Sequence, residues 1–120
     1  MRLHHVQLAA PPGCEEQARA FYGSMLGLDE ILKPEALRLR GGVWFALNAE
    51  QQLHIGVEEQ FVPAGKAHPA LALDPQALDA LADRLRGAGV EVFWDDAVPS
   101  VRRFYVADPW GNRLEILAAE

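Results

Sequence analysis

Hydrophobic side chains in the first half of the chain follow two different spacings. Residues 3–10 alternate between apolar and polar before the turn sequence Pro-Pro-Gly, which predicts a strand. Apolar residues then recur three and four positions apart over residues 18–26, which predicts a helix that ends at Gly27. Short strands are expected to follow, at about 28–32, 43–47 and 52–57.

The second half shows the same order of elements. The segment HPALALD, residues 68–74, predicts a strand, and Asp74 and Pro75 are suited to the N-cap and first position of a helix. The apolar face of that helix would consist of Leu78, Leu81, Ala82 and Leu85. Strands are expected at about 91–94, 102–107 and 113–118, with a hairpin turn at DPWGN, residues 108–112.

An internal repeat accounts for this shared order. Superimposing the halves pairs His5 with His68 and His54 with Glu115. We therefore expect a single α+β domain made of two βαβββ modules, one at about 1–62 and the other at about 63–120. The sequence identity between the halves is weak. The alternative interpretation is therefore that the two halves are unrelated and only share the same pattern of strands and helices.

The candidate polar residues share one side of the predicted strands. Side chains alternate across a strand, so the apolar neighbours of each residue define the face that packs on a helix. By this rule the opposite face carries the polar side chains of His5, Gln7, His54, His68 and Glu115, with small residues between them. This pattern favours a concave site over a second core.

Imidazole nitrogens and a carboxylate are suitable ligands for a divalent metal ion. His5, His68 and Glu115, with His54 as a possible fourth, would suit iron, nickel, zinc, cobalt or manganese and leave positions open for a substrate. Alternatively, each histidine is a solvated or hydrogen-bonded strand residue. His4 faces the other side of its strand and is expected to be structural.

Other residues on the same face are candidates for substrate binding. Arg103 and Tyr105 would lie on one face of their strand, where they could hold an anionic group, or they could form ordinary cross-strand surface pairs. Trp44 would either line the pocket or pack as a buried aromatic residue in a small core. Gln7 lies on the same face as His5 and is a further candidate contact.

Composition excludes several function classes. The formal charge of −6 is spread along the chain with no basic stripe, which argues against a nucleic-acid partner. No apolar run approaches the roughly 20 residues that a membrane span needs, and the N-terminus does not resemble a signal peptide. We expect a cytoplasmic protein, which agrees with the single cysteine, Cys14.

Five segments resemble the vicinal oxygen chelate superfamily, which includes glyoxalase I, fosfomycin resistance proteins, extradiol dioxygenases and bleomycin resistance proteins. They are LHHVQLAA, ARAFYGSMLGL, HPALALD, LRGAGVEV and RRFYVADPWGNRLEIL, and together they cover nearly the whole chain. The resemblance implies paired βαβββ modules forming a cupped, barrel-like mixed sheet, often as a dimer, with a metal ion inside the cup. It matches His5, His68 and Glu115 to the metal ligands of the fosfomycin resistance and dioxygenase branches.

Glyoxalase I carries a glutamate on the fourth strand, where this chain has His54. The resemblance also suggests that Glu115 acts as a catalytic general base if it leaves the metal during turnover. We therefore expect a metal-dependent enzyme, of lyase or isomerase type or a related one, acting on a small oxygen-rich substrate. One divalent ion, zinc, nickel, iron or manganese, would chelate that substrate.

Two other functions stay open. A metal-free homologue could sequester a small molecule such as an antibiotic, as bleomycin resistance proteins do. A dimeric interaction module without a small ligand would explain exposed strands but not the placement of the histidines. In every case we expect a homodimer with no membrane partner.

Overall fold

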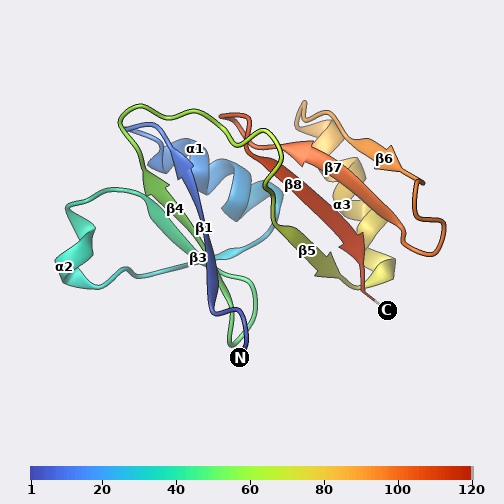
Figure 1. The fold of residues 1–120 in the computed structure, drawn as a ribbon, viewed down its shortest axis with the longest axis horizontal. Coiled ribbons are helices and arrows are strands. Elements are labelled where there is room, and N and C mark those ends of the chain that lie inside the picture. The colour runs from blue at the N-terminus through green and yellow to red at the C-terminus, as the bar shows by residue number, and fades with distance from the viewer. Residues whose placement is uncertain (120) are drawn as a thin grey trace. The chain divides into compact units, whose positions relative to one another are not determined.

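The computed structural model describes residues 1–119, which form two compact units, one up to Pro63 and the other from Ala64 onward. Each unit contains its own four-stranded mixed sheet, and the two sheets have the same strand order (Figure 1). No helix within residues 1–119 is long and apolar enough to cross a membrane.

The first unit has its strands in the order β1-β4-β3-β2. β1 runs parallel to β4, and the other neighbours are antiparallel. In chain order the elements are β1 (His5–Ala10), α1 (Glu15–Ala18), η1 (Arg19–Met25), β2 (Asp29–Ile31), α2 (Glu35–Arg38), β3 (Val43–Ala46) and β4 (Gln52–Val57). Apart from α2, this is the predicted strand-helix-three-strand order.

The second unit repeats this topology in the order β5-β8-β7-β6. Its elements are β5 (Ala70–Leu73), α3 (Pro75–Gly87), β6 (Phe93–Asp95), β7 (Arg103–Ala107) and β8 (Arg113–Ala118). Asp74 caps α3 by accepting a hydrogen bond of 2.9 Å from the amide of Gln76, as predicted. The predicted apolar face of α3, Leu78, Leu81, Ala82 and Leu85, is buried. The two βαβββ units confirm the predicted α+β fold.

The strand registers confirm the internal repeat residue by residue. In the first sheet Trp44 and Gln7 are the cross-strand partners of His54. In the second sheet Tyr105 and Ala70 are the partners of Glu115. Equivalent backbone positions in the two halves therefore carry His54 and Glu115, each beside an aromatic residue.

The first predicted helix is present but changes its hydrogen-bonding pattern. After α1 the chain continues as the π-helical segment η1, and the amide of Leu26 bonds to the carbonyl of Phe21 at 2.9 Å. Phe21 and Tyr22 are both fully buried, although they are adjacent in sequence. The short helix α2 was not predicted, because it buries none of its residues and so has no apolar periodicity.

The fifth strand starts later than predicted. β5 begins at Ala70, so His68 lies in the segment before the strand. Pro69 has no amide hydrogen to donate to a ladder, but its carbonyl accepts a hydrogen bond of 3.1 Å from the amide of Glu115. This bond holds the segment that contains His68 against β8.

Candidate functional site

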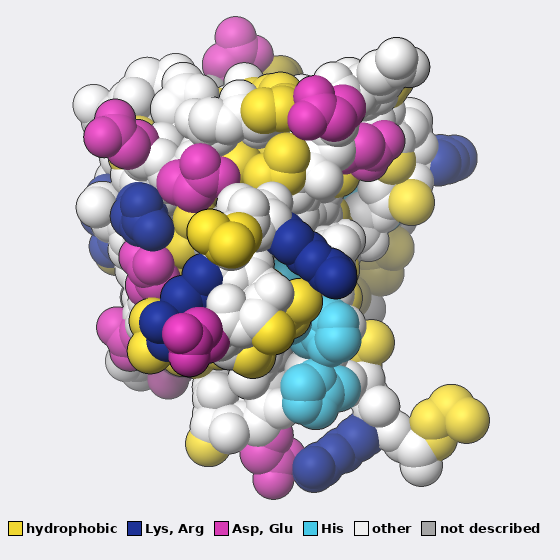
Figure 2. Space-filling view, turned by 90° about the vertical axis from the view of Figure 1, so that its left-hand side faces the viewer, with side chains coloured by type: hydrophobic (Ala, Val, Ile, Leu, Met, Phe, Trp, Pro, Cys, Tyr) yellow, Lys and Arg dark blue, Asp and Glu magenta, His cyan; other side chains and the backbone are white. Residues whose placement is uncertain are grey.

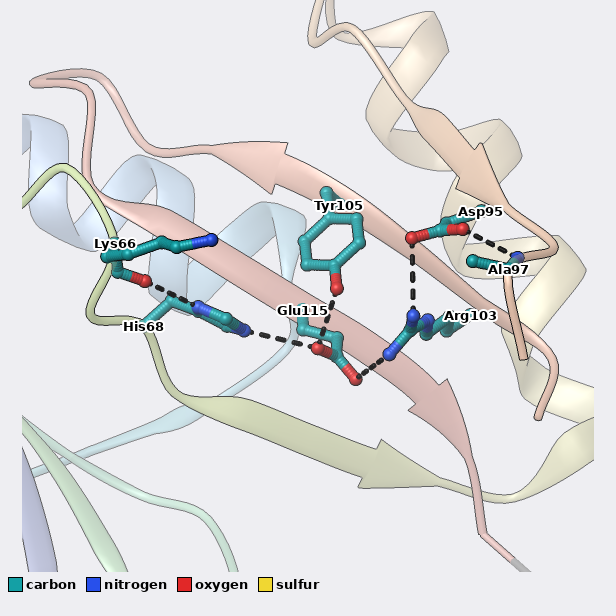
Figure 3. A network of polar contacts seen from close by, with 7 residues as sticks. All are labelled: Lys66, His68, Asp95, Ala97, Arg103, Tyr105 and Glu115. Carbon is teal, nitrogen blue, oxygen red and sulfur yellow. Dashed lines mark hydrogen bonds and ion pairs between the residues drawn. The ribbon is translucent and has the colours of Figure 1, made fainter.

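Glu115, in the middle of β8, lies at the centre of a polar network in the second unit. Its neighbours Leu114 and Ile116 are fully buried, so the alternation of the strand turns the carboxylate to the opposite face. The carboxylate accepts hydrogen bonds from the Tyr105 hydroxyl at 3.0 Å and from Arg103 at 3.4 Å (Figure 3). His68 Nε2 lies 3.1 Å from the same oxygen that Tyr105 contacts. Arg103, Tyr105 and Glu115 therefore lie on the same face of the sheet.

The network keeps Glu115 ionised. Burial acts to raise the pKa of this carboxyl group, but the contacts with His68, the Tyr105 hydroxyl and the Arg103 guanidinium outweigh it and lower the pKa. Burial, the hydrogen bond to Glu115 and its negative charge raise the pKa of Tyr105. Glu115 is thus a buried carboxylate, and Tyr105 is a neutral hydroxyl that donates to it.

His68 is oriented at both of its ring nitrogens. Nδ1 lies 2.9 Å from the carbonyl oxygen of Lys66, which can only accept a hydrogen bond, so Nδ1 carries the proton. In a neutral ring Nε2 then has a lone pair, and it faces an ionised carboxylate oxygen. Two acceptors at this distance need a proton or a cation between them. This pairing fits a metal ion, since metal-binding histidines usually donate their other nitrogen to a carbonyl or carboxylate.

Arg103 connects the network to the edge of the sheet. Its guanidinium lies 3.3 Å from Asp95 and 3.4 Å from Glu115, and its Nε is buried without a hydrogen-bond partner among the described residues. Sequence reasoning missed Asp95. The available signal was its cross-strand pairing with Arg103, which becomes visible only when the register of β6 and β7 is known.

The first unit places aromatic rings at the equivalent position. The His54 ring is stacked between Trp44, at a centroid distance of 3.8 Å, and His5, at 4.3 Å. Nε2 of His54 lies 2.8 Å from the side-chain oxygen of Gln52, to which it donates. The structure therefore brings together three of the predicted site residues, His5, His54 and Trp44.

His54 is neutral at physiological pH. Burial is the main cause that lowers its pKa to about 4, and the nearby His5, His4 and Lys33 add to the effect. The first unit therefore presents an aromatic stack centred on a neutral His54 where the second presents a charged network.

Gln7 and Trp44 line a pocket of about 200 Å³ within the first unit. Gln7 lies across Gly56, because a Cβ at position 56 would come within 2.8 Å of its amide group. Lys33 and Arg40, from the segment around α2, line the same pocket. Neither was a candidate from the sequence, since no predicted element placed them near Gln7.

Within each unit, the described residues bring the candidate metal ligands together in pairs. These are His5 with His54, and His68 with Glu115. No described group of three or more His, Cys, Asp or Glu side chains is arranged to hold an ion. The expected set of His5, His68 and Glu115 takes residues from both units, and it stays a prediction.

Comparison with known proteins gives a consistent assignment. The model of the Glyoxalase/Bleomycin resistance protein/Dioxygenase superfamily matches residues 2–116. The structure is similar to that of a glyoxalase family protein from Bacillus anthracis, with a TM-score of 0.92 and 50% identity, covering 100% of this chain and 96% of that one. No curated protein matches the sequence significantly.

More distant structures share the fold. A glyoxalase/dioxygenase from Nostoc punctiforme has a TM-score of 0.82 and 23% identity, covering 99% of this chain and 91% of that one. The fosfomycin resistance protein FosX from Listeria monocytogenes has a TM-score of 0.78 and 20% identity, covering 100% and 94%. With the match over residues 2–116, these findings show that the chain belongs to the Glyoxalase/Bleomycin resistance protein/Dioxygenase superfamily.

Proposed function

We propose that this protein is a metal-dependent enzyme that acts on a small oxygen-rich molecule. The observation that carries the proposal is the 3.1 Å approach of His68 Nε2 to the ionised Glu115 carboxylate. The proposed ligands are His68 and Glu115, with His5 as the third and His54 as a possible fourth. One zinc, nickel, iron or manganese ion fits these nitrogen and oxygen donors. The superfamily includes enzymes, among them the lactoylglutathione lyase from Agrobacterium tumefaciens.

When bound, the ion would polarise a substrate oxygen and stabilise negative charge that develops there. The chain's own residues prepare the carboxylate for this role. Tyr105 and Arg103 each donate to Glu115, so they fix its orientation and keep it ionised. We assign them a positioning role toward Glu115.

Glu115 is also the proposed general base. Its oxygens already accept hydrogen bonds from Tyr105 and Arg103 and lie beside His68 Nε2, and these contacts lower its pKa. A carboxylate that these contacts hold in its ionised form is a weaker base. Base catalysis by Glu115 would therefore be favoured by loosening of this network.

Metal content tests the proposal. Protein purified without a histidine tag or chelator is expected to hold close to one transition metal ion per chain, measured by elemental analysis. His68→Ala and Glu115→Gln should lose the ion while keeping the circular dichroism spectrum of the folded protein. Glu91→Gln removes the same charge at an exposed site and should keep the ion. Absence of metal that zinc, nickel, manganese and iron all fail to restore would overturn the proposal.

The aromatic stack of Trp44, His54 and His5 favours one alternative, a metal-free binding protein for a flat organic molecule. Such a protein would show quenching of tryptophan fluorescence by an organic cation in the presence of chelator. In the enzyme, binding of the small molecule would instead depend on the metal.

We also propose a homodimer, which light scattering coupled to size-exclusion chromatography would detect as twice the mass of 13.2 kDa.

A further inference from the structure

The pocket beside Trp44 differs in charge from the rest of this acidic chain. It has a volume of about 200 Å³ and lies within the first unit, and none of its lining residues is acidic. Two of them, Lys33 and Arg40, are cationic. Figure 2, which looks on to the side of the molecule that carries α2, shows Lys and Arg side chains exposed there together with His side chains.

The two cations of the pocket have no carboxylate partner among residues 1–119. Lys33 donates a hydrogen bond to the carbonyl of Gly41, and Arg40 forms no described ion pair. By contrast, several arginines elsewhere pair with a carboxylate: Arg2, Arg19, Arg86, Arg102 and Arg103. Glu15 is near the same segment, but its carboxylate accepts the amide of Gly42. Neither cation of the pocket is therefore held in an ion pair by a described carboxylate.

Neutral groups in the pocket are suited to hold the rest of a small ligand. The Trp44 ring is fixed by its stack on His54, at an interplanar angle of 3°. The Gln7 amide, which lies over Gly56, offers a donor and an acceptor. The volume is below the 300–1,000 Å³ range of typical drug-sized sites, which restricts the occupant to a small molecule.

We propose that this pocket binds the anionic oxygen group, carboxylate or phosphate, of the enzyme's small-molecule substrate. Lys33 and Arg40 contact the oxyanion, Trp44 packs against the adjoining carbon skeleton, and Gln7 bonds to a neutral polar group. The inference rests on the proposed function and narrows its substrate class to small organic acids or phosphate esters. An ammonium or guanidinium donor forms strong hydrogen bonds to such oxygens.

Inorganic phosphate and acetate are suitable probes, because they carry the proposed group without the rest of a substrate. Each is titrated into chelator-treated, ¹⁵N-labelled protein at constant ionic strength, and amide and indole shifts are followed by NMR. Saturable shifts are expected for at least one probe at Gly41, Gly56 and the Trp44 indole. Shifts that are absent for both probes, or that spread over the surface without saturating, would overturn the proposal.

Variants identify the residues responsible. Arg40→Gln and Lys33→Gln should each weaken binding of the responding probe by about fivefold or more, because each loses a charged donor. Arg86→Gln removes the same charge from an exposed position on α3 and should bind as the wild type does. Arg40→Lys should recover part of the affinity lost in Arg40→Gln. Arg40→Gln is the decisive variant, since Arg40 has no described partner whose loss would disturb the fold.

Equal affinity of Arg40→Gln and Arg86→Gln for the probe would contradict the proposal. Metal binding of the same variants separates this result from the proposed function. Arg40→Gln should bind metal as the wild type does, because Arg40 is not a proposed ligand. Wild-type protein that binds the probe but no metal would overturn the metal-dependent enzyme and leave the anion pocket in place.

Discussion

The carboxylate of Glu15 joins the start of α1 to the segment before β3 through one hydrogen bond. It accepts the amide of Gly42 at 2.9 Å, and Gly42 is buried. In Glu15→Ala this amide, on a buried residue, loses its hydrogen-bond partner. An unpaired buried backbone donor costs about 1–3 kcal/mol, so Glu15→Ala should lower the free energy of unfolding by that amount.

Glu16→Ala is the matched control. Glu16 also lies in the first turn of α1, so both substitutions remove one negative charge from the same helix start, an effect of about 0.3–1 kcal/mol. Glu16 is exposed and has no described contact with Gly42. Urea unfolding at pH 7, followed by circular dichroism, gives the difference between the two variants. A difference below about 0.5 kcal/mol would refute the reasoning, because the bond would then add nothing beyond helix-end charge.

The same bond predicts a pH dependence. Chiefly through the Gly42 amide, the pKa of Glu15 is lowered from its ordinary value of 4.5. A carboxyl group with a lower pKa in the folded state stabilises the protein above the unfolded value, and this contribution is lost as pH falls through the folded value. The stability gap between wild type and Glu15→Ala should therefore shrink below pH 4.5. A gap that stays constant into this range would contradict the assignment.

Two further substitutions test the packing of the fold and the polar network. Gly42→Ala should prevent stable folding, seen as loss of the cooperative thermal transition, because its φ is +86° and a Cβ would lie 2.2 Å from the carbonyl oxygen of Ile55. Gly87→Ala, where a Cβ meets nothing within 4 Å, should fold normally. Arg103→Gln should lower the free energy of unfolding in urea by about 2–4 kcal/mol, since Asp95 and Glu115 then face each other without the guanidinium between them. Loss of stability no greater than in Arg102→Gln, whose ion pair is exposed, would show that the Arg103 bridge contributes little.

Strand alternation explains why part of the candidate site was predictable. Arg103, Tyr105 and Glu115 follow a period of two on paired strands, so their shared face follows from the sequence once the apolar neighbours are assigned to the core. The same argument assigned Gln7 and His54 to one face of their strands, and the structure makes them cross-strand partners. Which residues become cross-strand neighbours depends on the register, which the sequence did not predict.

The remaining features depend on tertiary structure that leaves no local pattern. α2 has no buried face, and so the positions of Lys33 and Arg40 beside Gln7 could not be inferred from periodicity. Asp95 joins the network only through the register of a short edge strand. The proton on His68 Nδ1 follows from the carbonyl of Lys66, and no local sequence pattern indicates that contact.

The equivalence of His54 and Glu115 also bears on how such a chain can evolve. The two positions lie on equivalent strands, β4 and β8, and each has an aromatic cross-strand partner, yet one is a neutral stacked ring and the other a hydrogen-bonded carboxylate. After a duplication, the backbone template is preserved by core residues that do not face the site. Selection can then change the side chain at this position in one module while the equivalent position in the other module stays unchanged. New specificities can arise in this way without a new fold.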